Sequence, residues 1–180
     1  MEGFTLKLGQ LYPKSRGEVT LRSKDPKDLP IIRANYFENE SDLKAMVEAV
    51  KLGLKFFNTQ NMREIIKDVI TPHPDIHTDD SALAEFVKDN SLTVFHPVGS
   101  CAMGGSDDSV LDEYLRVRGV KNLRVVDSAS FPSIVSGNTN APVIMLAYKG
   151  SEMIIDEHYS KSKKKVLRVK DLISGIFFVC

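Results

Sequence analysis

The sequence predicts an α+β fold, and the spacing of its apolar residues supplies the reasons. Residues 4–13 and 17–23 alternate apolar and polar positions at period two, as strands with one buried face do. Residues 39–58 repeat apolar positions at helical spacing instead. Antiparallel strands come first, helices follow, and short strands within residues 115–133 lead to a final helix, an order typical of α+β chains.

The first half of the chain is expected to open with a hairpin, an extended segment and a long helix. Residues 4–13 and 17–23 form the hairpin-like pair, and the prolines within residues 25–37 keep that segment extended. A helix over residues 39–58 takes Ser41 as its N-cap. Its apolar face consists of Leu43, Met46, Val47, Val50 and Leu54.

Two further helices are predicted after the long one. The first covers residues 62–70 and is followed by a loop over residues 71–80. The second covers residues 81–90 and is capped by Asp80 or Ser81. Its apolar face consists of Leu83, Phe86 and Val87.

The second half is expected to contain short strands and one long helix. Residues 92–100 begin as a strand and end in a turn. Two short strands are predicted within residues 115–133, the second over residues 123–126. Residues 136–159 are predicted to be a polar turn followed by a helix, with Asn140 as its cap.

The charge balance argues against a polyanionic partner. Lys and Arg together number 24, as do Asp and Glu, so the net charge is zero and the chain has no electrostatic case for binding nucleic acid. The first ten residues lack the pattern of a secretory signal, and the longest apolar run is too short to span a membrane. The localisation of the protein therefore stays open.

His96 is the first candidate for chemistry. It lies at a predicted strand-to-turn junction, followed by Pro97, which stiffens the chain, and by Gly99 and Gly104, which allow close approach of a ligand. Histidine suits acid–base catalysis near neutral pH. A structural histidine with satisfied hydrogen bonds is the alternative, and the local sequence alone favours it.

Other nucleophile or metal sites have weaker support. Cys101 or Ser100 with His96 would suggest a hydrolase, but residues so close in sequence rarely form such a pair. His73 and His77 are four residues apart, but the prolines around them prevent the helix that would align them. No metal site is expected.

Polar residues also gather around two predicted element ends. In residues 135–143, VSGNTNAPV, two asparagines flank a threonine before the final helix, where an anion would be stabilised or where these residues simply cap the helix. Asp127 ends a predicted apolar strand, where it could face a ligand or start a turn.

The stretches HPVGSCAMG at residues 96–104 and VLDEYLRVRGVKNLRVVDSASFPSIVSGNTNAPVIMLAYKGSEMI at residues 110–154 resemble the C-terminal part of glucose–methanol–choline (GMC) flavoprotein oxidoreductases. Residues 13–37 resemble strands of the substrate domain of this family, especially of the glucose dehydrogenase-like members from insects. The resemblance runs from about residue 4 to residue 157. It implies a partial fold: the antiparallel sheet of the substrate domain with packed helices, and the C-terminal strand–helix segment of the FAD-binding domain.

The resemblance also implies roles for individual residues. His96 matches the proton acceptor of the family, and Asn138 matches the second member of the catalytic pair. FAD is the implied cofactor, and an alcohol or sugar is the implied substrate. The residues that match the FAD-contacting region are Asp127, Ser128, Thr139 and Asn140.

By the same resemblance, residues 1–95 belong to the substrate domain and residues 96–159 form the catalytic and FAD-contacting segment, while residues 160–180 are a basic, then apolar tail outside the core. The G-x-G-x-x-G unit that binds the ADP part of FAD in this family is not in the chain.

We therefore expect a C-terminal fragment of a GMC enzyme that is inactive without the amino-terminal half. Three explanations stay open: an incomplete sequence, which is favoured, a non-catalytic remnant or interaction module without FAD, and one half of a pair completed by a separate amino-terminal chain.

Overall fold

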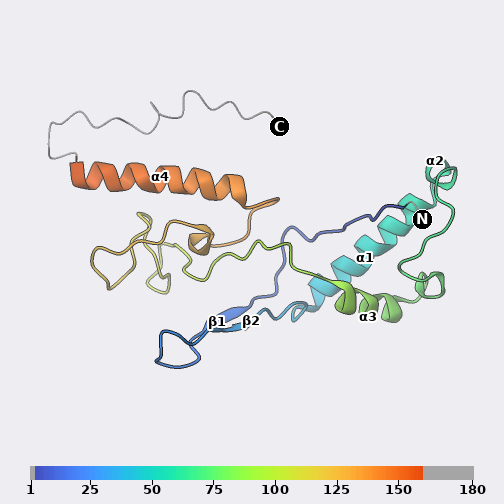
Figure 1. Cartoon of the computed structure of the whole chain (residues 1–180), viewed down its shortest axis with the longest axis horizontal. Helices are drawn as coiled ribbons and strands as arrows, with labels where there is room; N and C mark the ends of the chain where they lie inside the picture. The colour runs from blue at the N-terminus through green and yellow to red at the C-terminus, as the bar shows by residue number, and fades with distance from the viewer. Residues whose placement is uncertain (1–2, 160–180) are drawn as a thin grey trace. The chain divides into compact units, whose positions relative to one another are not determined.

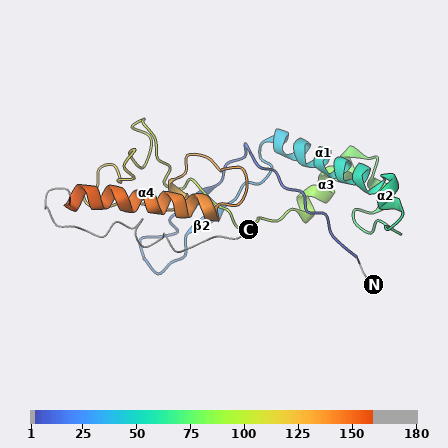
Figure 2. The same ribbon diagram turned by 90° about the horizontal axis from the view of Figure 1, so that it is seen from above.

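The structure is a computed structural model that describes residues 3–159. The chain divides into two compact units, the first ending at Phe95 and the second beginning at His96. Within the described residues, the first unit holds two strands and three α-helices, and the second holds one long α-helix (Figures 1 and 2). The α+β prediction is confirmed. The predicted tail after residue 159 lies outside the described residues.

The small sheet of the first unit pairs different segments from those predicted. β1, Glu18–Thr20, lies antiparallel to β2, Ile31–Arg33, with Val19 opposite Ile32. The predicted strand over residues 4–13 is wrong, because this segment instead runs along α1, Glu40–Phe57. Its period-two pattern therefore reflects contact with a helix and not pairing in a sheet.

Each long helix of the first unit begins with a side-chain cap that lies earlier than predicted. Asn39 caps α1 by accepting a hydrogen bond from the N–H of Ser41, so Ser41 is not the cap. Asp79 caps α3, Asp80–Asn90, through the N–H groups of Ser81 and Ala82. The prediction of Asp80 or Ser81 was wrong because the extended residue before each helix provides the oxygen.

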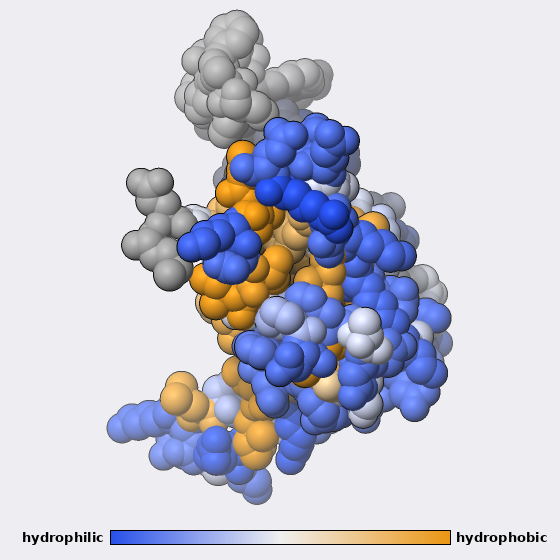
Figure 3. All heavy atoms as spheres, turned by 90° about the vertical axis from the view of Figure 1, so that its right-hand side faces the viewer, coloured by the Kyte–Doolittle hydropathy of each residue, from blue (hydrophilic) through white to orange (hydrophobic). Residues whose placement is uncertain are grey.

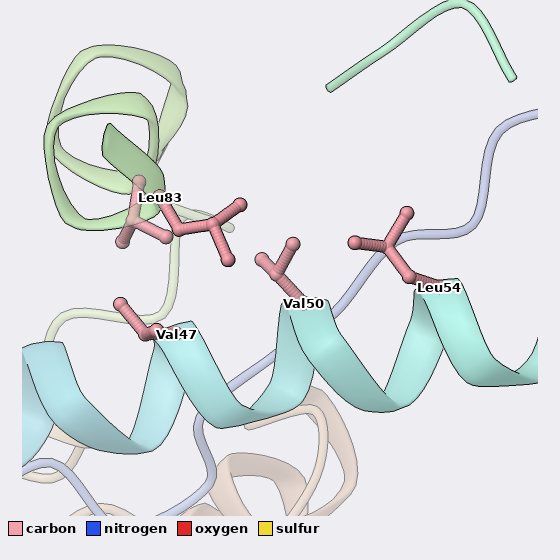
Figure 4. Close-up of a cluster of buried hydrophobic side chains, with 5 residues drawn as sticks. Val47, Val50, Leu54 and Leu83 are labelled. Atoms are coloured by element: carbon pink, nitrogen blue, oxygen red, sulfur yellow. The ribbon is translucent and has the colours of Figure 1, made fainter. Parts of the chain in front are cut away.

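The core of the first unit lies between α1 and α3. Figure 4 shows Val47, Val50 and Leu54 on one side of α1, with Leu83 of α3 opposite. Leu83 is fully buried, and Val87 completes the cluster. The helical spacing in the sequence therefore identified the helix faces that pack together.

The predicted helix over residues 62–70 is mostly wrong. α2, Gln60–Arg63, is a single turn, and the chain that follows is irregular. Ile65, Ile66 and Val69 are β-branched, which lowers helix propensity. The loop over residues 71–80 contains a 3₁₀ helix, Pro74–Ile76.

The second unit is built mainly from turns until its final helix. The predicted strands within residues 115–133 are reduced to isolated bridges, such as Arg116 with Arg124, and residues 92–95 form no strand. α4, Asn140–Tyr159, begins at the residue that was predicted to cap it. A Cβ placed on Gly150 would lie 2.5 Å from Cγ1 of Val126, so α4 packs closely on this segment.

Apolar side chains are also present on the surface of the described residues, as one face shows (Figure 3). Leu21, Leu92 and Phe95 are 86%, 90% and 84% exposed. None of the helices formed within residues 3–159 is long and apolar enough to cross a membrane.

Candidate active site

Main-chain hydrogen bonds hold the loop after His96 along the 3₁₀ helix Ser128–Ser130. The donor and acceptor pairs are Gly99 to Ser128 (3.2 Å), Cys101 to Ala129 (2.9 Å) and Met103 to Ser130 (2.9 Å). The Ser128 hydroxyl adds a bond to the carbonyl of Pro97 at 3.1 Å. Gly99 has a φ of +88°, a conformation that favours glycine. These bonds fix the backbone next to His96.

The His96 ring contacts two residues that are distant in sequence but adjacent to each other. Its Nε2 lies 3.3 Å from Oδ1 of Asn138, and its Nδ1 lies 3.0 Å from Oγ1 of Thr139. Gly137, with a φ of +102°, turns the chain just before these two residues. The structure therefore brings together the two residues that the resemblance paired, and it adds a third.

The two sides of the ring differ in exposure. Thr139 is buried, at 8% exposed, whereas Asn138 is exposed and His96 is half-buried. The carbonyl of Thr139 accepts the N–H of Val143 at 3.0 Å, which ties this residue to the first turn of α4. Nδ1 thus faces the protein interior, and Nε2 lies on the accessible side.

The residues predicted to contact FAD take different positions. Asp127 accepts the N–H of Ala129 at 2.8 Å with Oδ1 and so caps the 3₁₀ helix. The hydroxyl groups of Ser128 and Thr139 are bonded inside the unit. Asn140 is exposed at the first residue of α4. Among these four residues, Thr139 is the one within hydrogen-bond distance of the His96 ring.

The contacts among the described residues do not support the hydrolase or the metal site considered as alternatives. Both ring nitrogens of His96 have contacts with Asn138 and Thr139, so the ring is not paired with Cys101. His77 contacts the carbonyl of Pro72. Within residues 3–159, no group of three or more His, Cys, Asp and Glu side chains could hold a metal ion.

Asp42 is a buried carboxylate that the sequence reasoning missed. It is 2% exposed and lies in the first turn of α1. Burial raises its pKa, but hydrogen bonds from Ser15, Lys14 and Gln10 outweigh burial and hold the pKa well below its usual range. One signal was available in the sequence: Asp42 lies four residues before Met46, so a helix places it next to the apolar face.

A second carboxylate, Asp112, orders a turn in the second unit. It accepts the N–H groups of Tyr114 and Arg116 and pairs with the Arg116 guanidinium at 2.9 Å. Burial raises the pKa of Asp112, but these bonds lower it further than burial raises it. Arg124 pairs with Glu157 near the end of α4, and this contact lowers the pKa of Glu157.

An imidazole and an amide that lie side by side can together bind and deprotonate the hydroxyl group of a ligand. A neutral imidazole nitrogen can accept the hydroxyl proton, and the amide can donate to or accept from the oxygen. The amide cannot serve as the base, so the proton can go only to His96 within this pair.

Known proteins of similar sequence share this part of the chain. The alcohol dehydrogenase [acceptor] of Pseudomonas putida is 42% identical over 153 residues, which are 85% of this chain and 28% of that protein. The oxygen-dependent choline dehydrogenase of Rhizobium rhizogenes is 41% identical over 155 residues, with the same shares of the two chains. The chain therefore spans little more than a quarter of the length of these relatives.

A solved structure and a family model agree with these relatives. A formate oxidase of Aspergillus oryzae, studied for modification of its FAD, superposes with a TM-score of 0.74 at 31% identity over 80% of this chain and 25% of that one. The model of the family described as GMC oxidoreductase matches residues 13–147, well over half of the sequence. The chain belongs to the GMC oxidoreductase family.

Proposed function

We propose that the chain carries the acid–base part of a FAD-dependent oxidoreductase that acts on the CH–OH group of an alcohol or sugar. The contact of 3.3 Å between His96 Nε2 and Asn138 Oδ1 supports this most directly. It places one group able to take a hydroxyl proton beside one able to hold the hydroxyl oxygen. The names of the relatives from Pseudomonas putida and Rhizobium rhizogenes support alcohols and choline as the first substrates to test.

His96 would accept the hydroxyl proton at Nε2, because this nitrogen lies on the accessible side of the ring. Asn138 would orient the substrate by a hydrogen bond to its oxygen. FAD, when bound, would supply the acceptor for the hydride that leaves the same carbon as the hydroxyl becomes a carbonyl. The proton and the hydride together account for the two hydrogens that the alcohol loses.

The residues around His96 fit FAD in part. The exposed amide of Asn140 and the first N–H groups of the 20-residue helix α4 are donors suited to an electron-rich ring edge. Asp127 uses Oδ1 within the chain, so Oδ2 would be the atom that faces the cofactor. Ser128 and Thr139 would act by fixing the loops, because their hydroxyl groups already have partners.

Other parts of the binding surface would come from sequence outside this chain. It spans 28% of the Pseudomonas putida relative, and an amino-terminal region would supply the rest, in the same polypeptide or as a separate chain. Leu21, Leu92 and Phe95 are largely exposed, and we expect such a region to cover at least some of these side chains.

A chimera tests the proposal. Residues 4–157 would replace the matching part of the Pseudomonas putida alcohol dehydrogenase, and flavin absorbance and dye reduction would be measured with alcohols, choline and sugars. We expect bound flavin and alcohol-dependent dye reduction. His96→Gln should lower kcat roughly 100- to 10,000-fold, because the proton acceptor is lost.

His73→Gln is the matched control, since this histidine lies within residues 4–157, is exposed, and belongs to the first unit. Turnover that survives His96→Gln with flavin still bound would show that another group takes the proton. A chimera that folds but binds no flavin would favour the non-catalytic alternative.

A further inference from the structure

The His96 ring is held by two successive residues that differ in character. Asn138 contacts Nε2 at 3.3 Å from the exposed side, and Thr139 contacts Nδ1 at 3.0 Å from the buried side. Water competes for an exposed amide, but the hydroxyl of Thr139, a residue that is only 8% exposed, is better shielded from such competition. The contact with Thr139 is therefore the more constant of the two.

The hydrogen on a neutral imidazole decides which nitrogen can act as a base. One tautomer carries it on Nδ1 and leaves the Nε2 lone pair free, and the other does the reverse. The amide of Asn138 suits either tautomer, because a half-turn of its terminal bond exchanges oxygen for NH2. The partner of Nδ1 is thus the residue that can select the tautomer.

Thr139 is suited to accept a hydrogen bond from Nδ1–H. The residue before a helix normally uses its side-chain oxygen to accept an N–H from the second or third helical residue. The third residue of α4 is Pro142, which has no N–H. One of the usual donors to Oγ1 is therefore missing, and the bond from Val143 N–H to the Thr139 carbonyl holds the residue in place.

We propose that Thr139 is a positioning residue: its Oγ1 accepts Nδ1–H of His96, orients the ring and keeps Nε2 free of hydrogen on the accessible side. The part that this plays in alcohol oxidation rests on the function proposed above. The hydrogen bond and the tautomer concern only residues of this chain.

The full 180-residue chain, labelled with ¹⁵N-histidine, tests the inference by NMR at pH 9, where histidine side chains are neutral. A nitrogen that carries hydrogen resonates far upfield of a bare one, and His96→Gln identifies the signals of His96. We expect the Nδ1–H tautomer in the wild type. Thr139→Val should shift the equilibrium toward Nε2–H, and Thr139→Ser should restore Nδ1–H.

Thr59→Val is the control, because the Thr59 hydroxyl bonds the end of α1 in the first unit and should leave the His96 signals unchanged. A wild-type ring in the Nε2–H form would overturn the inference, whether or not the valine variant folds. An unchanged tautomer in folded Thr139→Val would overturn it as well.

Kinetics in the chimera separate this inference from the proposed function. Thr139→Val should lower kcat at least roughly tenfold with little change in KM, and Thr139→Ser should recover most of it. If His96→Gln abolishes turnover while Thr139→Val changes neither tautomer nor kcat, only the role of Thr139 fails. If the tautomer shifts as expected but His96→Gln has no effect, only the proposed function fails.

Discussion

The two units of this chain are stabilised in different ways. In the first, α1 and α3 bury an apolar cluster that includes Val50 and Leu83 (Figure 4). The second also buries Leu111, Leu115 and Phe131, but much of residues 96–139 is ordered by main-chain hydrogen bonds and side-chain caps, and one long helix follows. Apolar packing is non-directional, whereas a hydrogen bond depends on both the distance and the angle between donor and acceptor. The candidate site lies in the unit whose geometry depends on hydrogen bonds.

Buried polar groups sharpen this difference. Asp42 fixes residues 10–15 to the first turn of α1 in the first unit. Thr139 fixes the His96 ring in the second. The first contact joins a loop to a helix that already packs on α3, and the second orients a single side chain. Removing each should therefore change different properties, stability for Asp42 and tautomer for Thr139.

The largest effect on stability is expected from Leu83→Ala. This side chain is fully buried between α1 and α3, and its removal should lower the free energy of unfolding of the first unit by about 3 kcal/mol. Leu52→Ala is the control, because Leu52 is 68% exposed on α1. Hydrogen exchange of the α1 amides measures both, and equal effects would show that the cluster is not the core.

Asp42→Asn should lower the same free energy by about 2 kcal/mol. The carboxylate now accepts hydrogen bonds from the N–H groups of Lys14 and Ser15. In asparagine, an NH2 group would replace one of the accepting oxygens and would face these donors without forming a hydrogen bond. Asp68→Asn, at an exposed position, should change little. Urea unfolding checks both variants. If residues 10–15 keep their protection from exchange in Asp42→Asn, the carboxylate does not hold this segment.

The same carboxylate should make stability depend on acid pH. The folded pKa of Asp42 lies below the unfolded value, so its contribution is fully present above about pH 4 and is lost as the pH falls below that. Asp42→Asn should therefore reduce the loss of stability below pH 4. Unfolding free energies measured from pH 2 to 6 test this, and parallel curves for the two proteins would contradict it.

The smallest effect compares two helical glycines, one in each unit. A Cβ on Gly150 would lie 2.5 Å from Val126, whose short branched side chain cannot move far, so Gly150→Ala should cost about 1–2 kcal/mol. A Cβ on Gly53 would meet the flexible end of Leu6 at 3.3 Å and lie in ordinary contact with Leu8 at 3.7 Å, so Gly53→Ala should be neutral or stabilise by up to about 1 kcal/mol. Thermal unfolding gives the sign of each change, and stabilisation by both would refute the close packing of α4.

The periodic spacing of apolar residues predicted the two longer helices of the first unit correctly. The helices over residues 39–58 and 81–90 were correct because one face of each is apolar at helical spacing. The strand over residues 4–13 was wrong because contact with a helix can impose the same alternation as a sheet. Which segment covers α1 depends on Asp42, a contact between residues about thirty positions apart that local patterns do not contain.

Within the candidate site, the order of the motifs identified His96 and Asn138, and the structure places these two residues in contact. The contact of Thr139 with Nδ1 was not predicted, because it depends on how the chain turns at Gly137 and enters α4. The roles of His96 and Asn138 in catalysis stay predictions that the chimera tests.

The main-chain ladder beside His96 has a consequence for how the sequence can drift. Backbone N–H and carbonyl groups are the same for every residue except proline, so most substitutions at Ser100 or Ala102 would leave the ladder intact. Gly99 is the exception, because a φ of +88° would strain the backbone of any residue that replaced the glycine. Substitutions at these two positions can therefore accumulate during evolution while the backbone next to His96 stays in place.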